Sequence, residues 1–281
     1  MDRERITRQN RRIFTLLSEY INFMPDAVTP EMIRETKELC LCTAEEAFRI
    51  LISGILDIYE DKELRQGWIS KMFSCLDREK YENDPYRKKI RLPAVVDGEW
   101  EITKDRYKPY EVFVFNDPKT DGEGRLIPQI GFFEEEYVFP VVKQSGREWM
   151  LITPNEIETM REPVARAFGH GITYGLGLGY FAFMASEKEE VRSVTVVERD
   201  ESVIRLFKKH ILPLFPNKEK INIVLADALE FAKGDYRADF VFADIWHDPS
   251  DGCDLYLKLK ALEKDGIDYA YWIEDTIKLY L

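Results

Sequence analysis

The chain has 281 residues, of which 45% are hydrophobic and 33% charged, the composition of a globular protein with a sizeable core. With 40 Lys and Arg against 52 Asp and Glu, its net charge of -12 argues against general nucleic-acid binding, which needs a basic surface. No apolar run approaches the roughly 20 residues of a membrane span, and no signal peptide is recognisable, so a cytoplasmic protein is the default expectation.

Residues 1–88 are expected to form a helical N-terminal domain, because apolar residues recur there at helical spacing. Thr29, followed by a proline, is typical of a helix N-cap. Thr43 has a glutamate three residues later, which predicts a capping box at the start of a helix over roughly 43–60. A further helix is expected over about 61–76.

Residues 89–153 change in character and predict a small antiparallel sheet. Its expected strands are Glu111–Phe115, Tyr137–Lys143 and Glu148–Thr153, separated by clusters of turn residues. Ser145 and the glycine after it are typical of a hairpin turn.

Residues 154–281 alternate between helix and strand, which predicts βαβ units and a parallel sheet, the pattern of a Rossmann-like α/β domain. About one helix and one further element are expected after the last of these strands. The expected elements are a helix over 154–168, strand Ile172–Tyr174, a helix near 180–188, strand Val191–Glu198, helix Asp200–Ile211, strand Ile221–Leu225, helix Ala228–Lys233, strand Phe240–Asp244 and a helix over roughly 254–264.

The most specific motif is the glycine-rich run from Tyr174 to Gly179, which follows a strand and opens a helix. Glycines there allow a tight turn and a close approach of a ligand to the main chain. The spacing is G-x-G-x-G, whereas the phosphate-binding motif G-x-G-x-x-G would need glycine at the position of Tyr180, which argues against NAD and FAD. The alternative is a tight strand-to-helix turn with no ligand.

Three acids follow consecutive predicted strands, and strand ends of a parallel sheet share one edge. Glu198 ends the second strand of the domain, where a carboxylate can accept both hydroxyls of a ribose. Asp227 and Asp244 follow the third and fourth. For Asp227, as for Asp200, helix capping is the competing interpretation. All three together with the glycine run favour a ligand site.

Residues 154–249 resemble class I S-adenosylmethionine-dependent methyltransferases, and most closely their spermidine-synthase-like branch. The preceding strand and the helix over 148–168 are similar to the hairpin and lead-in helix of that branch. The segments that carry the resemblance are Val196–Val203, Lys208–Pro213, Ala226–Phe231, Asp239–Asp244 and Asp248-Pro249.

The resemblance implies S-adenosylmethionine as cofactor, with S-adenosylhomocysteine or methylthioadenosine as product. It places the methionine part of the cofactor in the glycine run and the ribose on Glu198. It places the adenine edge beside Asp227 and the sulfonium beside Asp244. The implied cofactor-binding residues are Tyr174, Gly175, Gly177, Gly179, Glu198, Arg199, Asp227, Ala228 and Asp244, and the catalytic candidates are Asp244 and Asp248.

The chain also departs from the pattern of that branch. Leu178 stands where spermidine synthases have an acid that holds the donor's amino group, and Leu151 and Met160 stand at the positions of their polyamine-binding Gln and Tyr. Ordinary methyltransferases carry an acid at the position of Thr173. Only 37 residues follow Asp244, so the closing strand pair of the methyltransferase sheet is expected to be reduced or missing.

Methyl transfer to an unidentified small-molecule acceptor is therefore the leading function. Aminopropyl transfer is the alternative, and a non-catalytic nucleoside-binding or interaction module that kept the fold is a third possibility. The sequence leaves open the acceptor, the catalytic competence, the role of the N-terminal helices and the oligomeric state, for which a homodimer is one option.

The cysteines and histidines show no zinc-binding spacing, so no metal is expected. Asp244, His247, Asp248 and Cys253 form the one set with suitable ligand types, and the sequence does not favour it. His247 is a second candidate for a general base, with an exposed loop histidine as the simpler interpretation.

Overall fold

The computed structural model of the chain describes residues 3–281, which group into two compact units. The first unit comprises the chain up to Glu79 together with Asp105–Val138. The second comprises Lys80–Lys104 together with Phe139–Leu281. Among residues 3–281, no helix combines the length and the apolar character needed to cross a bilayer.

Two long strands carry the chain from one unit to the other. They are β3 (Trp100–Tyr107) and β6 (Tyr137–Gln144), and each contains a boundary between the units. The contacts therefore place the boundaries inside these strands, and not after residues 88 and 153.

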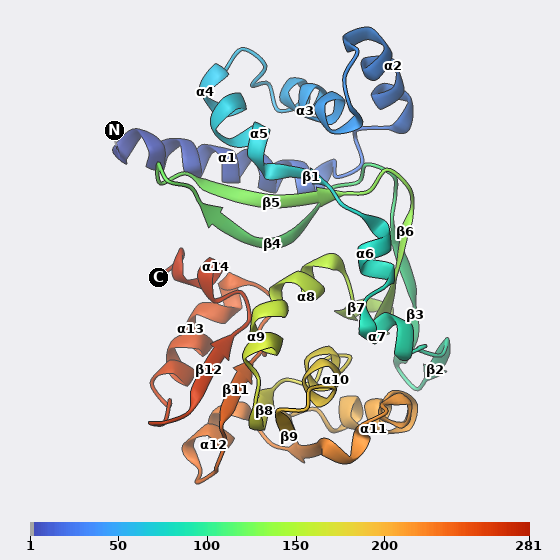
Figure 1. Cartoon of the computed structure of the whole chain (residues 1–281), viewed down its shortest axis with the longest axis vertical. Helices are drawn as coiled ribbons and strands as arrows, with labels where there is room; N and C mark the ends of the chain where they lie inside the picture. The colour runs from blue at the N-terminus through green and yellow to red at the C-terminus, as the bar shows by residue number, and fades with distance from the viewer. Residues whose placement is uncertain (1–2) are drawn as a thin grey trace. The chain divides into compact units, whose positions relative to one another are not determined.

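The first unit packs helices on a three-stranded sheet with the order β1-β5-β4 (Figure 1). Its core includes Phe48, whose ring stacks on Phe132 with the centroids 4.2 Å apart. The elements are α1 (Arg3–Phe23), α2 (Pro30–Cys40), α3 (Ala44–Ile55), α4 (Lys62–Leu64), the π-helical turn Arg65–Ile69, α5 (Ser70–Met72), β1 (Phe73–Cys75), α6 (Arg78–Glu82, which runs into the second unit), β4 (Phe113–Thr120) and β5 (Leu126–Phe132).

The expected helix caps are present in this unit. The Thr29 hydroxyl accepts a hydrogen bond from the Met32 amide, and Thr43 forms the capping box with Glu46. The helix expected over 61–76 is wrong near its end, where Phe73–Cys75 forms β1 instead. Phe73 is fully buried and pairs in parallel with β5, so a partner distant in sequence decides the conformation of this segment.

The β-rich region forms two sheets, not the one small antiparallel sheet expected. The second has the order β2-β3-β6-β7, with β2 (Val95–Asp97) and β7 (Arg147–Leu151) at its edges. The hairpin expected at Ser145 joins β6 to β7, and both turn residues have positive φ, 50° and 80°. Strands β2, β3 and β5 are missing from the sequence expectations.

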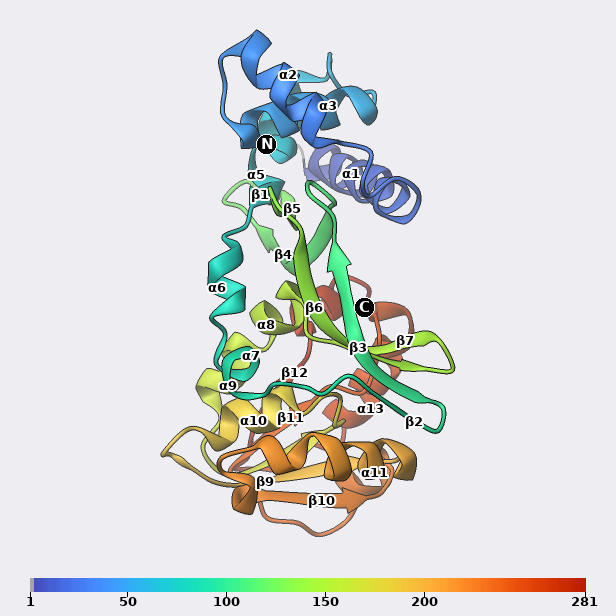
Figure 2. The same cartoon turned by 90° about the vertical axis from the view of Figure 1, so that its right-hand side faces the viewer.

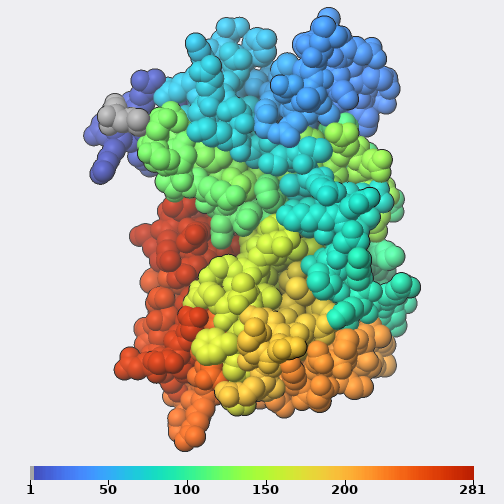
Figure 3. Space-filling model, viewed as in Figure 1, coloured from blue at the N-terminus to red at the C-terminus, as the bar shows by residue number. Residues whose placement is uncertain are grey.

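The second unit contains the predicted Rossmann-like domain (Figure 2). Figure 3 shows the surface of its strand–helix part in yellow to red. The elements of the unit besides β2, β3, β6 and β7 are α7 (Pro85–Lys89), α8 (Pro154–Thr159), α9 (Arg161–Arg166), β8 (Gly169–Tyr174), α10 (Tyr180–Ser186), β9 (Val191–Glu198), α11 (Glu201–His210), the 3-10 turns Leu212–Leu214 and Lys218–Lys220, β10 (Ile221–Leu225), α12 (Ala228–Lys233), β11 (Phe240–Ala243), α13 (Pro249–Lys260), β12 (Asp268–Tyr271) and α14 (Glu274–Lys278).

The five strands of this domain are all parallel, in the order β10-β9-β8-β11-β12. Helices α10, α11 and α12 contact β9. The strand order reverses between β8 and β11, and ligands of open parallel sheets bind at the carboxyl ends of strands beside such a reversal.

The end of the domain differs from the expectation in one respect. Helix α13 begins at Pro249, not near residue 254, because Asp248 caps it with a capping box to Asp251. One parallel strand, β12, then completes the sheet, and no strand follows it within the described residues. The closing strand pair is thus absent from the part of the chain that the structure describes, as expected.

Candidate functional site

A cavity of about 350 Å³ opens at the carboxyl ends of β8, β9, β10 and β11, where the strand order reverses. This volume is in the range of small-molecule sites. All of its lining residues belong to the second unit. It is the expected site, and the glycine loop between β8 and α10 forms part of its wall.

The glycine loop needs glycine for reasons of both conformation and space. Gly175 and Gly179 have φ values of 94° and 75°, which L side chains rarely adopt. A Cβ at Gly175 would lie 2.0 Å from the carbonyl oxygen of Asp244, and one at Gly179 would lie 2.5 Å from the ring of Phe207. At Gly177, the nearest atom would be the Met150 sulfur at 3.9 Å, so this glycine leaves room in the cavity.

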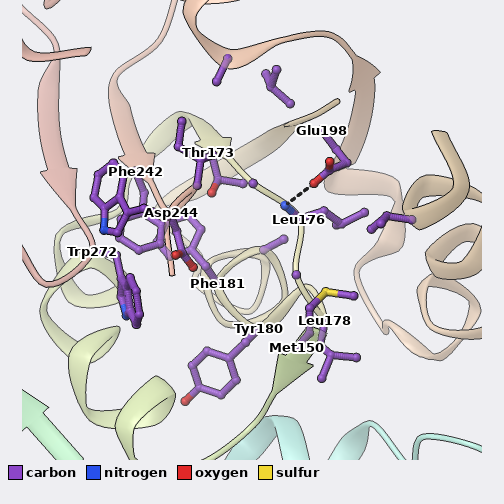
Figure 4. Close-up of a pocket in the computed structure, with 18 of the residues that line it drawn as sticks. Met150, Thr173, Leu176, Leu178, Tyr180, Phe181, Glu198, Phe242, Asp244 and Trp272 are labelled. Atoms are coloured by element: carbon purple, nitrogen blue, oxygen red, sulfur yellow. Dashed lines mark hydrogen bonds between the residues drawn. The ribbon is translucent and has the colours of Figure 1, made fainter. Parts of the chain in front are cut away.

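Glu198 lies at the end of β9 and joins this strand to the glycine loop. One carboxylate oxygen accepts a hydrogen bond from the Leu176 amide at 3.2 Å (Figure 4), and the other accepts from the Asp200 amide at 2.8 Å. Each oxygen retains a lone pair, so the carboxylate can still accept from two hydroxyl groups. A ribose diol is a ligand of this kind.

Asp227 and Ala228 line the cavity beyond the end of β10. Asp227 also caps α12, since one of its carboxylate oxygens accepts from the Leu229 and Glu230 amides at 2.9 and 3.1 Å. The capping interpretation therefore holds for Asp227, and it is compatible with a position on the cavity wall. Asp200 likewise caps α11.

The remaining predicted residues are divided between the cavity and other places. Arg199 lines the cavity. Tyr174 does not, and its ring packs edge-on against Phe231, with the centroids 6.2 Å apart. Gly179 does not line the cavity, and it lies against the rings of Phe207 and Phe215. Asp248 is exposed and is the N-cap of α13, so the structure does not bring this catalytic candidate to the cavity.

Asp244 follows β11 and lies beside Phe181, Phe242 and Trp272 (Figure 4). Neither its carboxylate nor that of Glu156, which comes from α8 and lines the same cavity, has a hydrogen-bond or ion-pair partner within residues 3–281. The pKa of Asp244 is raised by burial, and the nearby His247 lowers it in part. The pKa of Glu156 is raised by burial and by the charge of Asp244.

Most of the remaining wall is apolar, and its polar exceptions include Thr173, Tyr180 and His247. Met150 and Leu151 come from β7, Met160 ends α8, and Leu178 comes from the glycine loop. Figure 4 shows Met150 next to Leu178. Such a surface excludes water and suits the apolar parts of a nucleoside thioether.

His247 lies on the loop after β11 and lines the cavity, although its side chain is largely exposed. Its Nδ1 lies 3.0 Å from a carboxylate oxygen of Asp251, and its ring packs edge-on against Trp149. Within residues 3–281, no group of three or more Asp, Glu, His or Cys is placed to hold a metal ion.

Sequence reasoning missed Glu156. Helix α8 carries this acid two residues before Glu158, which differs in that it pairs with Lys80 and Arg161. Nothing in the local sequence separates the two glutamates, because the difference arises from partners elsewhere in the fold. The length of the helix and the position of Asp244 would both have been needed to place Glu156 in the cavity.

No protein-family model matches this chain, and no curated protein matches it either. Solved structures do. Spermidine synthase from Thermotoga maritima is 15% identical, with 47% of this chain and 48% of that chain covered and a TM-score of 0.35. A spermidine synthase in complex with the transition state analogue AdoDATO is 17% identical, with 47% and 50% covered and a TM-score of 0.37.

The CcbJ methyltransferase from Streptomyces caelestis is 22% identical, with 40% of this chain and 49% of that chain covered and a TM-score of 0.29. The matched part thus spans about half the length of each of these three proteins. Both classes of enzyme that the motifs resemble are among the structures similar to this chain. The likeness is one of fold.

Proposed function

We propose that the cavity binds S-adenosylmethionine and that the protein transfers its methyl group to a small-molecule acceptor. The observation that carries this proposal is the pairing of the glycine loop with Glu198 at the strand-order reversal. A loop that leaves the main chain open to a ligand and a carboxylate that can hold a diol are what an adenosine derivative requires.

Each part of the cavity has a role in this proposal. Glu198 holds the ribose hydroxyls, and the wall at Asp227 and Ala228 receives the adenine edge. The apolar residues exclude water from the reacting centre. When bound, the sulfonium supplies an electrophilic methyl carbon with a neutral thioether as leaving group.

The acceptor's lone pair forms a bond to that carbon while the carbon–sulfur bond breaks, so alignment is the main contribution of the protein. If the acceptor carries a proton, Asp244 is placed to receive it, and its raised pKa suits it to hold that proton near neutral pH. The charges of Glu156 and Asp244 interact, so Glu156 shares the role of holding this proton.

One observation favours aminopropyl transfer as a second candidate. Asp244 and Glu156 are two half-buried carboxylates for which the structure shows no hydrogen-bond or ion-pair partner within residues 3–281, and such a pair suits an ammonium group. Against it stand the apolar residues Leu178, Leu151 and Met160, which offer an amine no hydrogen-bonding side chain.

A thermal-shift series with S-adenosylmethionine, S-adenosylhomocysteine and methylthioadenosine tests the proposal. A ligand at 100 times its Kd stabilises the folded state by about 2.7 kcal/mol. We expect a shift with the first two. A shift with methylthioadenosine alone would favour the aminopropyl reaction. If no ligand shifts the melting temperature, the non-catalytic module is the function that remains.

A further inference from the structure

Helix α7 makes two hydrogen bonds to residues on either side of Gly179 in the cavity wall. The Tyr86 hydroxyl donates to the Leu178 carbonyl oxygen at 2.6 Å. The Tyr180 hydroxyl donates to the Asp84 carboxylate at 2.9 Å. Leu178 and Tyr180 both line the cavity, whereas Asp84 and Tyr86 do not. We call these two bonds the α7 clamp.

The two α7 residues of the clamp are buried, and further hydrogen bonds hold Asp84 in place. Tyr86 is completely buried, and Asp84 is 7% exposed. Asp84 also caps α7 by accepting hydrogen bonds from the Tyr86 and Arg87 amides, which fixes the carboxylate relative to the Tyr86 ring. That ring packs edge-on against Phe183, with the centroids 5.4 Å apart. Without the Tyr86 hydroxyl, the Leu178 carbonyl would lose its bond in a place that water does not reach easily.

The same loop is also held by packing and by its own backbone hydrogen bonds. A side chain at Gly179 would collide with the rings of Phe207 and Phe215, so the loop backbone lies directly on them. The Gly179 amide donates to the Leu176 carbonyl at 2.8 Å, and the Gly175 amide donates to the Val197 carbonyl at 3.0 Å. The α7 clamp adds a side-chain hydrogen bond at Leu178 and another at Tyr180, where these contacts do not hold the loop.

We propose that Asp84 and Tyr86 are positioning residues that hold the glycine loop in its ligand-binding conformation. The inference rests on the proposed function for the identity of the ligand, but the restraint on the loop does not depend on it. Neither residue touches the cavity, and both lie outside the segment that resembles the methyltransferases. They act through Leu178 and Tyr180.

A loop without the clamp would spend less time in the binding conformation, and the apparent affinity falls in proportion to that fraction. The loss of one buried hydrogen bond corresponds to roughly a three- to tenfold change in such an equilibrium. Tyr86→Phe keeps the ring and removes only the hydroxyl, so this variant isolates the bond to the loop.

The experiment compares full-length wild type, Tyr86→Phe and the control Tyr256→Phe by hydrogen exchange and by calorimetric titration with S-adenosylhomocysteine. Tyr256 is also buried, and its hydroxyl donates to Glu274 at 2.7 Å, away from the glycine loop. We expect the amides of residues 175–180 to exchange roughly three- to tenfold faster in Tyr86→Phe only, and the Kd to rise in Tyr86→Phe only, by at most the same factor. Thermal stability should fall in both variants.

Unchanged loop exchange and unchanged affinity in a folded Tyr86→Phe would overturn the clamp. A wild type that binds no nucleoside would defeat the proposed function instead, and the exchange data would still decide whether the clamp restrains the loop. Should Tyr86→Phe fail to fold, Tyr180→Phe removes the other bond, and faster exchange over 175–180 is the expected result there too.

Discussion

Glu198 is the residue on which recognition of the nucleoside depends most in this proposal, because its carboxylate lines the cavity and can still accept from both ribose hydroxyls. Its carboxylate already orders Leu176 and Asp200, and hydrogen bonds to a charged acceptor are stronger than those between neutral groups. We expect Glu198→Ala to weaken S-adenosylhomocysteine binding by about 1.5–3 kcal/mol in a calorimetric titration. Glu201→Gln, on the exposed start of α11, is the control and should bind as the wild type does. Equal affinity of a folded Glu198→Ala and the wild type would remove Glu198 from the site.

The Asp244–Glu156 pair should make the protein less stable as the pH rises. Both pKa values are higher in the folded state than in an unfolded chain, so the folded state binds more protons above the ordinary carboxyl range near pH 4. Stability then falls from about pH 4 upward until the raised pKa values are passed.

Asp244→Asn should flatten this slope, because it removes one titrating group and the repulsion on Glu156. Urea unfolding of both proteins between pH 4.5 and 8 measures the effect. Parallel slopes in the variant and the wild type would show that the pair does not titrate as its burial implies.

At the scale of single elements, Asp248 is the position where the helix-cap interpretation and the catalytic interpretation predict different results. Its carboxylate accepts from the Ser250 amide at 2.6 Å at the start of α13. Asp248→Ala should lower the free energy of unfolding by about 0.5–2 kcal/mol, as the loss of a cap does, and leave S-adenosylhomocysteine affinity unchanged. Chemical denaturation and titration of the same sample test both parts. Lost affinity at unchanged stability would return Asp248 to the site.

The elements that could be predicted from the sequence are those whose signal is local. Strands Val191–Glu198 and Ile221–Leu225 and helix Ala228–Lys233 have the expected bounds, because apolar runs and capping residues define them within a few positions. Strand β1 was expected to be helical, since its pairing partner lies more than 50 residues away. Strand β3 was missed because the charged run Lys104–Arg106 interrupts its alternation of apolar and polar residues.

The site follows the same rule. The glycine loop and the acids at the strand ends were predicted, since strand ends of a parallel sheet must meet. The sequence did not predict the roles of Glu156, Asp84 and Tyr86. Glu156 lines the cavity from α8, and the other two contact the glycine loop from the start of α7, and the placement of both helices depends on tertiary packing. Tyr174 belongs to the motif, yet the strand's alternation turns its side chain away from the cavity.

At the scale of the whole molecule, the division into units predicts which truncations fold. Residues 89–281 would lack Asp84 and Tyr86, and would keep β5 without the helices that cover it. Ile130 and Phe132 of β5 belong to one core cluster with Ile13 and Phe48. We expect a protein consisting of residues 89–281 to aggregate on size-exclusion chromatography. A soluble monomer with cooperative unfolding would show that the first unit is dispensable for folding.

The central claim is that the cavity at the strand-order reversal holds an adenosine-based sulfonium or thioether. Calorimetric titration of the full-length wild type with S-adenosylhomocysteine, beside Glu198→Ala and the control Glu201→Gln, tests it most directly. The account predicts saturable one-site binding that Glu198→Ala weakens and Glu201→Gln leaves intact. No heat of binding in the wild type, or binding that is indifferent to the Glu198→Ala change, would contradict it.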